Sequence, residues 1–292
     1  MERSGLRDDP IVPLAGTRAE GHALGIDVGG TGVKAAVVDL ATGHLLTDQI
    51  EEKTPHPATP GAVVEAIAHV LRELEVSGEL QPDMAAACGL PGVVKFGRLM
   101  TAANLDKSWV EAPAEELMAE RLGRPVLAIN DADAAGLAEM TYGAGAGNEG
   151  TVLFVGIGTG IGSALFIQSQ LVPNCEFGHI ELYGQDAETL VSGASRERRG
   201  LGWKEWAADF NAYLAHMELY LWPDLVIIGG GVSRAWAEYE RYLESRAPLV
   251  TARLLNTAGV VGAALAGANA QQQRSELEGK PSQAARGAAL AG

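Results

Sequence analysis

Residues 25–36, GIDVGGTGVKAA, place a carboxylate beside a glycine-rich bend. Glycine lets an anion approach backbone amides closely, so such a bend can bind a phosphate. The amides that it exposes belong to four residues, Gly29, Gly30, Thr31 and Gly32. Asp27, at the end of the incoming strand, would repel a phosphate unless Mg²⁺ lies between them. The stretch therefore predicts a metal-bound nucleotide or polyphosphate, with Asp27 as metal ligand directly or through water. A tight hairpin with no ligand is the alternative.

Two other phosphate-binding patterns do not fit this stretch. Gly30, Gly32 and Ala35 match the G-x-G-x-x-A spacing of dinucleotide-binding proteins, in which the glycine turn opens a helix. Residues 33–46, VKAAVVDLATGHLL, are rich in valine and interrupted by a Thr-Gly turn, so they predict the second strand of a hairpin. The chain contains no G-x-x-x-x-G-K-[ST] sequence of the P-loop type.

Two further glycine clusters offer similar chemistry. Residues 156–162, GIGTGIG, predict a second bend, whose phosphate-binding residues would be Gly158, Thr159 and Gly160. A third cluster follows the strand LVII and precedes a helix expected near Ser233; its members are Gly229, Gly230 and Gly231. A nucleoside or a further phosphate could lie there against a helix N-terminus. Taken alone, each cluster is also compatible with an ordinary turn.

Asp131 is the candidate catalytic base. It follows the apolar strand VLAI and precedes a predicted helix, so its carboxylate would lie at the floor of a cleft. There it could accept the proton of a hydroxyl and orient that oxygen toward phosphorus. Asn130, Asp131 and Asp133 are also residue types preferred at helix N-termini, and their spacing alone favours capping. Asp133 is interpreted as a helix-end residue.

The elements that position these residues alternate along the chain. Apolar runs predict strands at 23–28, 33–40, 84–90, 126–129, 152–157, 163–167 and 225–228. Helical periodicity predicts helices at 61–75, 113–122, 132–140, 203–221, 234–244 and 258–268. This alternation indicates an α/β protein. Segments 24–38 and 153–167 both consist of strand, Gly/Thr turn and strand, a repeat that would give two similarly built halves.

Composition limits the classes of function. A chain of 292 residues suits two domains, and its formal net charge of −15 disfavours nonspecific binding to nucleic acid or anionic lipid. The two cysteines form no C-x-x-C pair. Neither a signal peptide nor an apolar stretch of membrane-spanning length is found, which predicts a cytoplasmic protein without membrane partners.

At this point the motifs resemble those of a known group. The strings DVGGTGVK (27–34), LFVGIGTGIG (153–162) and IIGGGV (227–232) look like the phosphate-1, phosphate-2 and adenosine motifs of actin-like sugar kinases. EFGHIEL (176–182) narrows the resemblance to the repressor–ORF–kinase (ROK) family. Four segments look like its polyphosphate glucokinase branch: LPGVV (90–94), TAANLDKSW (101–109), NDADAAGLAEM (130–140) and WPDLVIIGGGVS (222–233). The resemblance covers residues 22–268.

The resemblance implies roles for particular residues. Asp131 would be the catalytic base, and Lys34 would join the glycine bends in binding phosphate. The sugar-binding residues would be Asn104, Asn130, Glu176, His179 and Glu188. Glu188 is included because ETLVSG (188–193) is similar to the E-T-x-A-S-G segment of the family. A lone histidine is more often a core residue than a ligand, but the spacing of Glu176 and His179 in Glu-x-Gly-His favours the functional interpretation.

The resemblance also implies a fold and a domain organisation. The fold would be the actin-like (ribonuclease H-like) α/β fold of sugar kinases, with two α/β domains flanking a cleft. We expect a small domain at 22–131, completed by a C-terminal helix at 257–268, and a large domain at 132–256. Residues 1–21 and 269–292 would be flexible tails. Since the family is commonly dimeric, a homodimer is expected.

The implied activity is that of a glucokinase. It would use inorganic polyphosphate, ATP or both, with Mg²⁺, to phosphorylate the 6-hydroxyl of glucose, and mannose is a second candidate acceptor. The alternatives are an ATP-only hexokinase of the same family and a non-catalytic sugar-binding regulator. A transcriptional repressor would need a DNA-binding segment, and the residues before Ala23 show no helix-turn-helix pattern.

Two local features bear on zinc and on polyphosphate. Most family members carry a cysteine-rich zinc motif shortly after the Gly-His pair, whereas this chain has IELYGQDAE, so zinc is not expected. Two runs are basic in an acidic chain: Lys95, Arg98 and Lys107 in 92–109, and Arg196, Arg198, Arg199 and Lys204 in 196–204. As a hypothesis, at least one of them lines the entrance for polyphosphate; a solvated surface is the alternative.

Overall fold

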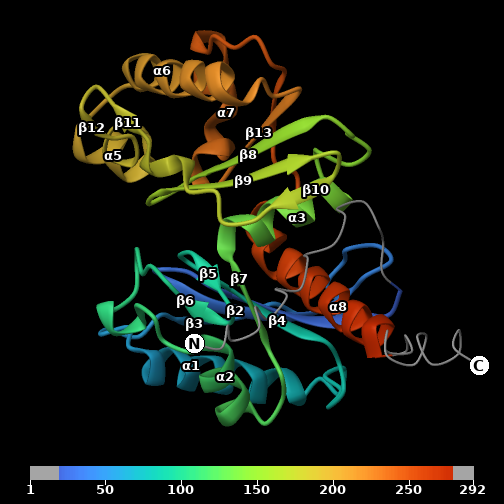
Figure 1. Cartoon of the computed structure of the whole chain (residues 1–292). Coiled ribbons are helices and arrows are strands. Elements are labelled where there is room, and N and C mark those ends of the chain that lie inside the picture. Colours follow the sequence, from blue (N-terminus) through green and yellow to red (C-terminus); the bar gives the residue numbers. More distant parts are fainter. Residues whose placement is uncertain (1–19, 279–292) are drawn as a thin grey trace, which may run out of the picture.

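The computed structural model describes residues 20–278, which form two stacked β-sheets with helices between and outside them (Figure 1). The first sheet has the strand order β3 (Ile50–Lys53), β2 (Gly32–Asp39), β1 (His22–Val28), β4 (Ala86–Leu90) and β7 (Leu127–Asn130). The second has the order β10 (Gln170–Val172), β9 (Ile161–Ile167), β8 (Thr151–Ile157), β13 (Leu225–Gly229) and β14 (Leu249–Thr251).

The two sheets share one topology. In each, three consecutive strands form an antiparallel meander, and two later strands are added in parallel beside the first strand of that meander. The internal repeat expected from segments 24–38 and 153–167 is therefore confirmed as β1–β2 and β8–β9. Two small hairpins project from this frame: β5 (Val94–Lys95) with β6 (Arg98–Leu99), and β11 (Glu181–Leu182) with β12 (Gln185–Asp186).

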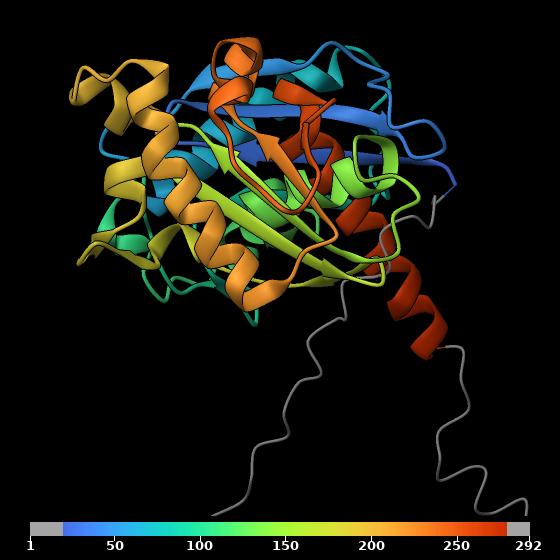
Figure 2. The same cartoon turned by 90° about the horizontal axis from the view of Figure 1, so that it is seen from above.

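Helices cover both sheets. The described α-helices are α1 (Pro60–Glu75), α2 (Ala114–Leu122), α3 (Asp131–Tyr142), α4 (Glu188–Val191), α5 (Gly193–Arg198), α6 (Trp203–Leu221), α7 (Trp236–Tyr239) and α8 (Ala258–Glu278). Helices α1 and α2 lie outside the first sheet, α3 and α8 lie between the sheets, and α6 lies across the second sheet when seen from above (Figures 1 and 2). Short 3₁₀ turns join them: η1 (Lys107–Trp109), η2 (Phe177–His179), η3 (Gly231–Ala235), η4 (Glu240–Tyr242) and η5 (Leu255–Thr257).

Local sequence explains the start of α1. Thr59 is its N-cap, and its Oγ1 accepts a hydrogen bond from the amide of Ala62 at 3.4 Å. Pro60 occupies the first helical position, where a missing N–H costs nothing. Apolar residues at helical spacing then face the first sheet, including Val63, Ile67 and Leu74.

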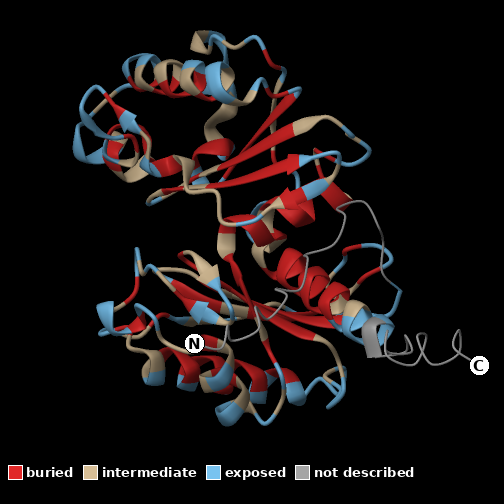
Figure 3. Ribbon diagram, viewed as in Figure 1, coloured by how far each residue is buried: buried red, intermediate tan, exposed pale blue. Residues whose placement is uncertain are grey.

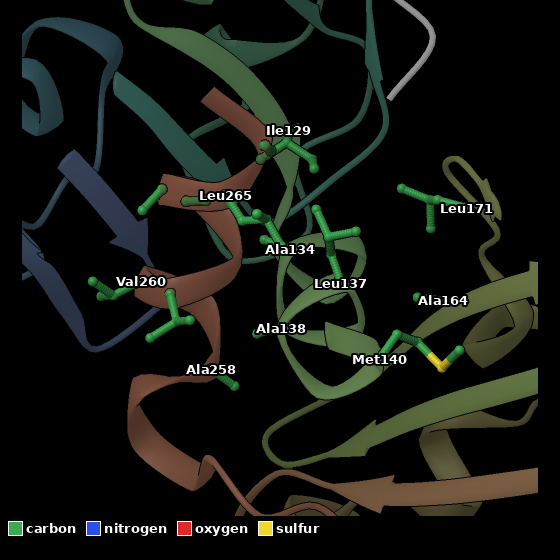
Figure 4. Packing of buried hydrophobic residues seen from close by; sticks show 14 of the residues in the cluster. Ile129, Ala134, Leu137, Ala138, Met140, Ala164, Leu171, Ala258, Val260 and Leu265 are labelled. Carbon is green, nitrogen blue, oxygen red and sulfur yellow. The ribbon is translucent and has the colours of Figure 1, made fainter. Parts of the chain in front are cut away.

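The core extends through the strands of both sheets and the inner faces of the helices (Figure 3). Its central part is the contact between α3 and α8, where Ala134 and Leu137 face Val260 and Leu265 (Figure 4). These helices approach closely because small residues line the contact. A Cβ atom on Gly262 would lie 1.7 Å from the carbonyl oxygen of Ala134. Helices α3 and α8 thus link the two sheets.

Most of the predicted elements occur, but several short elements were not predicted and two helices differ from their expected form. The short strands β3, β10 and β14 were not predicted, because three or four residues give too little periodicity. The helix predicted at 234–244 is instead η3, α7 and η4, since Tyr239 packs against aromatic rings of α6 and Trp236 packs against Tyr239. Helix α8 continues to Glu278 rather than ending at 268, because no glycine or proline follows Gly267 within it. The remaining tail residues, 1–19 and 279–292, lie outside the described part.

Candidate active site

Three parallel strands of the first sheet end at one edge, and their ends carry the candidate catalytic residues. Strand β1 pairs with β4 so that Asp27 lies opposite Gly89, and β4 pairs with β7 so that Leu90 lies opposite Asn130. A Cβ atom on Gly89 would lie 3.6 Å from Asp27 Oδ1 and 3.5 Å from Asp131 Cα. The two aspartates therefore flank Gly89, and a Cβ atom at this position would be in van der Waals contact with both.

Asp131 is the first residue of α3, and its surroundings raise the pKa of its carboxyl. Its Oδ1 accepts a hydrogen bond from the amide of Ala132 at 2.8 Å. Burial, followed by the negative charge of Asp27, raises the pKa of Asp131 to about 8, against the smaller opposing effect of that hydrogen bond. A carboxylate with a raised pKa is a stronger base than an ordinary aspartate. Asp131 therefore holds a proton more strongly than an ordinary aspartate does.

Asp27 differs from Asp131 in its partners. Burial raises its pKa, Lys34 on the neighbouring strand lowers it, and Glu51 raises it further. The N-terminal turn of α8 packs against it, since a Cβ atom on Gly259 would lie 2.7 Å from Asp27 Cγ. Magnesium sites in phosphoryl-transfer proteins use one or two carboxylates together with substrate phosphates and water. The pair of Asp27 and Asp131 fits such a site, and no group of three or more metal-binding side chains occurs within residues 20–278.

The first glycine bend joins β1 to β2, as expected. The amide of Gly29 donates to the carbonyl of Gly32 at 2.9 Å, and Thr54 Oγ1 donates to the carbonyl of Gly29 at 2.6 Å. Asn104 reaches the bend from another loop, because a Cβ atom on Gly30 would lie 3.1 Å from Asn104 Cβ. Lys34 pairs with Asp27 across the two strands. Predicted phosphate-site residues and the predicted sugar-site residue Asn104 therefore lie together.

The second bend joins β8 to β9 and is held by two helices that sequence reasoning did not predict. The amide of Gly158 donates to the carbonyl of Gly160 at 2.9 Å. The amide of Ala194, in α5, donates to the carbonyl of Gly158 at 3.3 Å. Glu188, in α4, accepts the amide of Ile161 on its Oε2 at 2.8 Å. Glu188 thus contacts the phosphate-type bend directly.

The third cluster differs from its expected form. Gly229 ends β13, and Gly230 has a φ of +73°, a conformation that favours glycine. A Cβ atom on Gly230 would lie 2.4 Å from the carbonyl oxygen of Ile157, so this turn packs against the second bend. The element that follows Gly231 is the 3₁₀ turn η3 rather than an α-helix. The strand and turn are as predicted, but the long helix expected near Ser233 is absent from this described segment.

Three of the predicted sugar-binding side chains, those of Asn130, Glu176 and His179, lie next to one another. Asn130 Nδ2 donates to Glu176 Oε1 at 3.3 Å, and Glu176 Oε2 lies 3.9 Å from His179 Nε2. Asn130 also caps α3, because its Oδ1 accepts the amide of Asp133 at 2.9 Å. Burial raises the pKa of Glu176, the charge of His179 lowers it, and that of Glu188 raises it. The arrangement provides carboxylate, amide and imidazole groups, which match sugar hydroxyls.

Three residues near these side chains were not predicted as functional. Asp186 hydrogen-bonds His179, with Oδ2 2.8 Å from Nδ1. Asn174 connects β5 with α3: its side chain accepts the amide of Val94 at 2.7 Å, and its own amide donates to Asp133 Oδ2 at 2.7 Å. Burial raises the pKa of Asp133 to about 7. Asp133 is a helix-end residue as expected, but no sequence pattern indicated its contact with Asn174, which is 41 positions away.

The basic runs differ in how their side chains are used. In the second run, Arg196 stacks on Trp203 at 3.7 Å, and Arg199 pairs with Asp209 at 2.8 Å. In the first run, the side chains of Lys95, Arg98 and Lys107 are exposed. Lys95 also lowers the pKa of Asp133, although burial outweighs it, so its charge lies near the site. The first run is therefore the better candidate for binding a polyanion.

Two sheets of matching topology, with a glycine bend on each and paired aspartates between them, define the actin-like class of sugar kinases. Comparison with solved structures supports this class. The inorganic polyphosphate/ATP-glucomannokinase from Arthrobacter sp. strain KM aligns with a TM-score of 0.80 and 47% identity, covering 87% of this chain and 100% of that one. A ROK family glucokinase from Streptomyces griseus, in complex with glucose and AMPPNP, aligns with a TM-score of 0.72 and 28% identity, covering 84% and 98%.

The sequence comparisons agree. The ROK family model matches residues 23–195. The polyphosphate glucokinase of Mycobacterium tuberculosis is 45% identical over 252 residues, which cover 86% of this chain and 93% of that protein. The chain belongs to the ROK family. Within residues 20–278, no helix is both long and apolar enough to cross a membrane.

Proposed function

We propose that the chain is a glucokinase that transfers a phosphoryl group from inorganic polyphosphate or ATP to the 6-hydroxyl of glucose. The observation that carries this proposal is the placement of Asp27 and Asp131 on either side of Gly89, at the edge where three parallel strands end. The relatives named above are a polyphosphate glucokinase and a polyphosphate/ATP-glucomannokinase, which supports both the acceptor and the donors.

In the proposed reaction, glucose binds between the sheets, held by Asn104, Asn130, Glu176, His179 and Glu188. Asp131 accepts the proton of the 6-hydroxyl as that oxygen attacks the terminal phosphorus. The bond between this phosphorus and its bridging oxygen breaks, and the shortened polyphosphate or ADP leaves. The products are glucose 6-phosphate and a protonated Asp131, which returns its proton to water.

The phosphate chain would lie between the two bends. Amides of the Gly29–Gly32 and Gly158–Gly160 turns would bind its oxygens, with Lys34 adding positive charge. Asp27 would hold Mg²⁺, which when bound neutralises charge on the transferred phosphoryl group. With ATP as donor, the turn at Gly229, Gly230 and Gly231 would contact the nucleoside. Mannose as a second acceptor, a homodimer and a cytoplasmic location complete the proposal.

The decisive experiment measures initial rates of hexose 6-phosphate formation with each donor and acceptor separately. We expect glucose 6-phosphate from both polyphosphate and ATP in the presence of Mg²⁺, and loss of both activities with excess chelator. Activity with ATP alone would favour an ATP-only hexokinase. Glucose binding without turnover on either donor would favour a sugar-binding regulator and overturn the proposal.

A further inference from the structure

Asp186 connects two of the proposed sugar-binding residues. It ends the β11–β12 hairpin, two positions before Glu188. Its Oδ2 lies 2.8 Å from His179 Nδ1, and its Oδ1 accepts the amide of Glu188 at 2.9 Å. Thr189 Oγ1 donates to its carbonyl oxygen at 2.7 Å, which fixes the backbone there. Both carboxylate oxygens are therefore used as acceptors, each by a different partner.

This contact determines which nitrogen of His179 carries the proton. An ionised carboxylate only accepts hydrogen bonds, so Nδ1 must be the donor in the pair with Asp186. In the neutral imidazole Nε2 is then an acceptor, and it lies 3.9 Å from Glu176 Oε2, beyond hydrogen-bond distance. Two acceptors at this separation suit two neighbouring hydroxyls of a hexose, each donating one hydrogen bond.

The surroundings of His179 also set its charge. Burial lowers the pKa of His179. The hydrogen bond and charge of Asp186, together with the charges of Glu188 and Glu176, outweigh burial, so the pKa of His179 is raised above its ordinary value. Glu176 immediately precedes the η2 turn, Asp186 is in β12 and Glu188 is in α4. Above its pKa the ring is neutral, and Asp186 selects the tautomer with an accepting Nε2.

We propose that Asp186 is a positioning residue for glucose, which holds His179 in the Nδ1-protonated tautomer and links it to Glu188. This inference rests on the proposed function, because it takes His179 as a sugar ligand. The link continues beyond the sugar side chains: Glu188 binds the amide of Ile161 beside the second bend. The Asp186 carboxylate thus ties the orientation of a sugar-binding imidazole to the segment that holds a phosphate-binding turn.

Asparagine cannot replace Asp186 in this arrangement. Its side chain has one accepting oxygen and one donating amino group, whereas both partners here donate. If the oxygen keeps the amide of Glu188, the amino group faces His179 Nδ1 and favours the opposite tautomer. Nε2 then carries the proton and cannot accept from a sugar hydroxyl. The opposite side-chain orientation would place the amino group against the backbone N–H of Glu188.

The test combines ¹⁵N NMR of the histidine rings with steady-state kinetics. The chain has six histidines, and a His179→Gln variant assigns the signal of His179. At a pH where the ring is neutral, we expect the Nδ1-protonated pattern in the parent, the Nε2-protonated pattern in Asp186→Asn, and a mixture in Asp186→Ala. We expect the KM for glucose to rise about tenfold in Asp186→Asn, with kcat and the KM for ATP changed less than about twofold. Glu181→Gln, on the paired strand of the same hairpin, is the control and should match the parent.

The outcomes separate this inference from the proposed function. An unchanged His179 tautomer in both Asp186 variants overturns the positioning role, even if glucose is phosphorylated normally. A changed tautomer with an unchanged KM for glucose also overturns it. If glucose does not shift the His179 signals of the parent, His179 is not a sugar ligand, and the proposed site itself is wrong. Should Asp186→Asn fail to fold, Asp186→Ala carries the same comparison.

Discussion

At the scale of single residues, Asp131 and Asp133 are neighbouring acids in the same helix turn but differ in exposure and in hydrogen-bond partners. Asp131 and Asp133 are both in the first turn of α3, and burial raises the pKa of both, to about 8 and about 7. Asp131 lies beside Gly89 and is partly exposed, whereas Asp133 is 1% exposed and binds the amide of Asn174. The first can reach a substrate and the second cannot. Chemistry is therefore expected only from Asp131.

Asp131→Asn should fold and bind glucose but lose at least about a hundredfold in kcat, because the amide cannot accept the hydroxyl proton. Initial rates and calorimetric titration with glucose measure the two effects. Asp133→Asn makes the same chemical change two positions away and should keep kcat within about threefold. Turnover by Asp131→Asn close to that of the parent would remove Asp131 as the base.

Asp133 should make stability depend on pH. The folded chain holds its proton up to about pH 7, whereas an unfolded aspartate loses it near 3.8. Between these values the folded state binds more protons, so the free energy of unfolding decreases as pH rises. Asp133→Asn removes this contribution. The Tm of Asp133→Asn minus the Tm of the parent should therefore be several degrees more positive at pH 8 than at pH 4. A difference in Tm that does not change with pH would contradict the assignment.

At the scale of elements, close helix packing determines where the site residues lie. Helix α8 contacts β1 and α3 through glycines, since a Cβ atom on Gly25 would lie 1.8 Å from the carbonyl oxygen of Val260. Its first turn meets Asp27, and α3 begins with Asp131. The distance between these helices thus influences both aspartates at once.

Gly262→Ala should lower stability strongly, because its Cβ would lie 1.7 Å from the carbonyl oxygen of Ala134. Overpacking of this kind costs about 1–3 kcal/mol or more, which for a chain of this size lowers Tm by roughly 3–10 °C. Gly61→Ala is the matched control, because Gly61 is also helical and no atom lies within 4 Å of its Cβ position. Thermal unfolding of the two variants measures the difference, and equal Tm values would mean that α3 and α8 can separate at little cost.

At the scale of the whole molecule, an acidic chain must bind a polyanionic donor. The net charge of −15 opposes polyphosphate, so local positive charge has to compensate. In the second basic run Arg196 contacts Trp203 and Arg199 contacts Asp209, whereas the first run presents exposed side chains, of which Lys95 lies close enough to lower the pKa of Asp133. Because the side chains of the first run are exposed to solvent, we favour the β5–β6 hairpin, which carries Lys95 and Arg98, as the polyphosphate entrance.

Replacing Lys95, Arg98 and Lys107 together by glutamine should raise the KM for polyphosphate several-fold at low salt, with the KM for ATP nearly unchanged. The effect should shrink as salt screens the remaining charges. Arg198→Gln combined with Lys204→Gln is the control, from exposed positions of the second run. A larger effect in the control pair would move the entrance to that run, and no effect in either set would exclude both.

The sequence by itself determined the features that depend on neighbours along the chain. Glycine spacing predicted the bends at Gly29–Gly32 and Gly158–Gly160, alternation predicted the α/β class, and Asp131 followed from its place between strand and helix. The family could be recognised from the sequence because its motifs are short contiguous stretches of residues that occur in the same order along this chain.

Tertiary structure alone decided which residues meet. Sheet register placed Asp27 and Asp131 beside Gly89, and helix packing set α8 against Asp27. The contacts of Asp186 with His179 and of Asn174 with Val94 join separate elements, the second across 80 positions. Such contacts have no local periodicity, since they arise when distant segments bury their apolar faces together. For the same reason the aromatic packing on α6, rather than the helical pattern of 234–244, decided the structure of that segment.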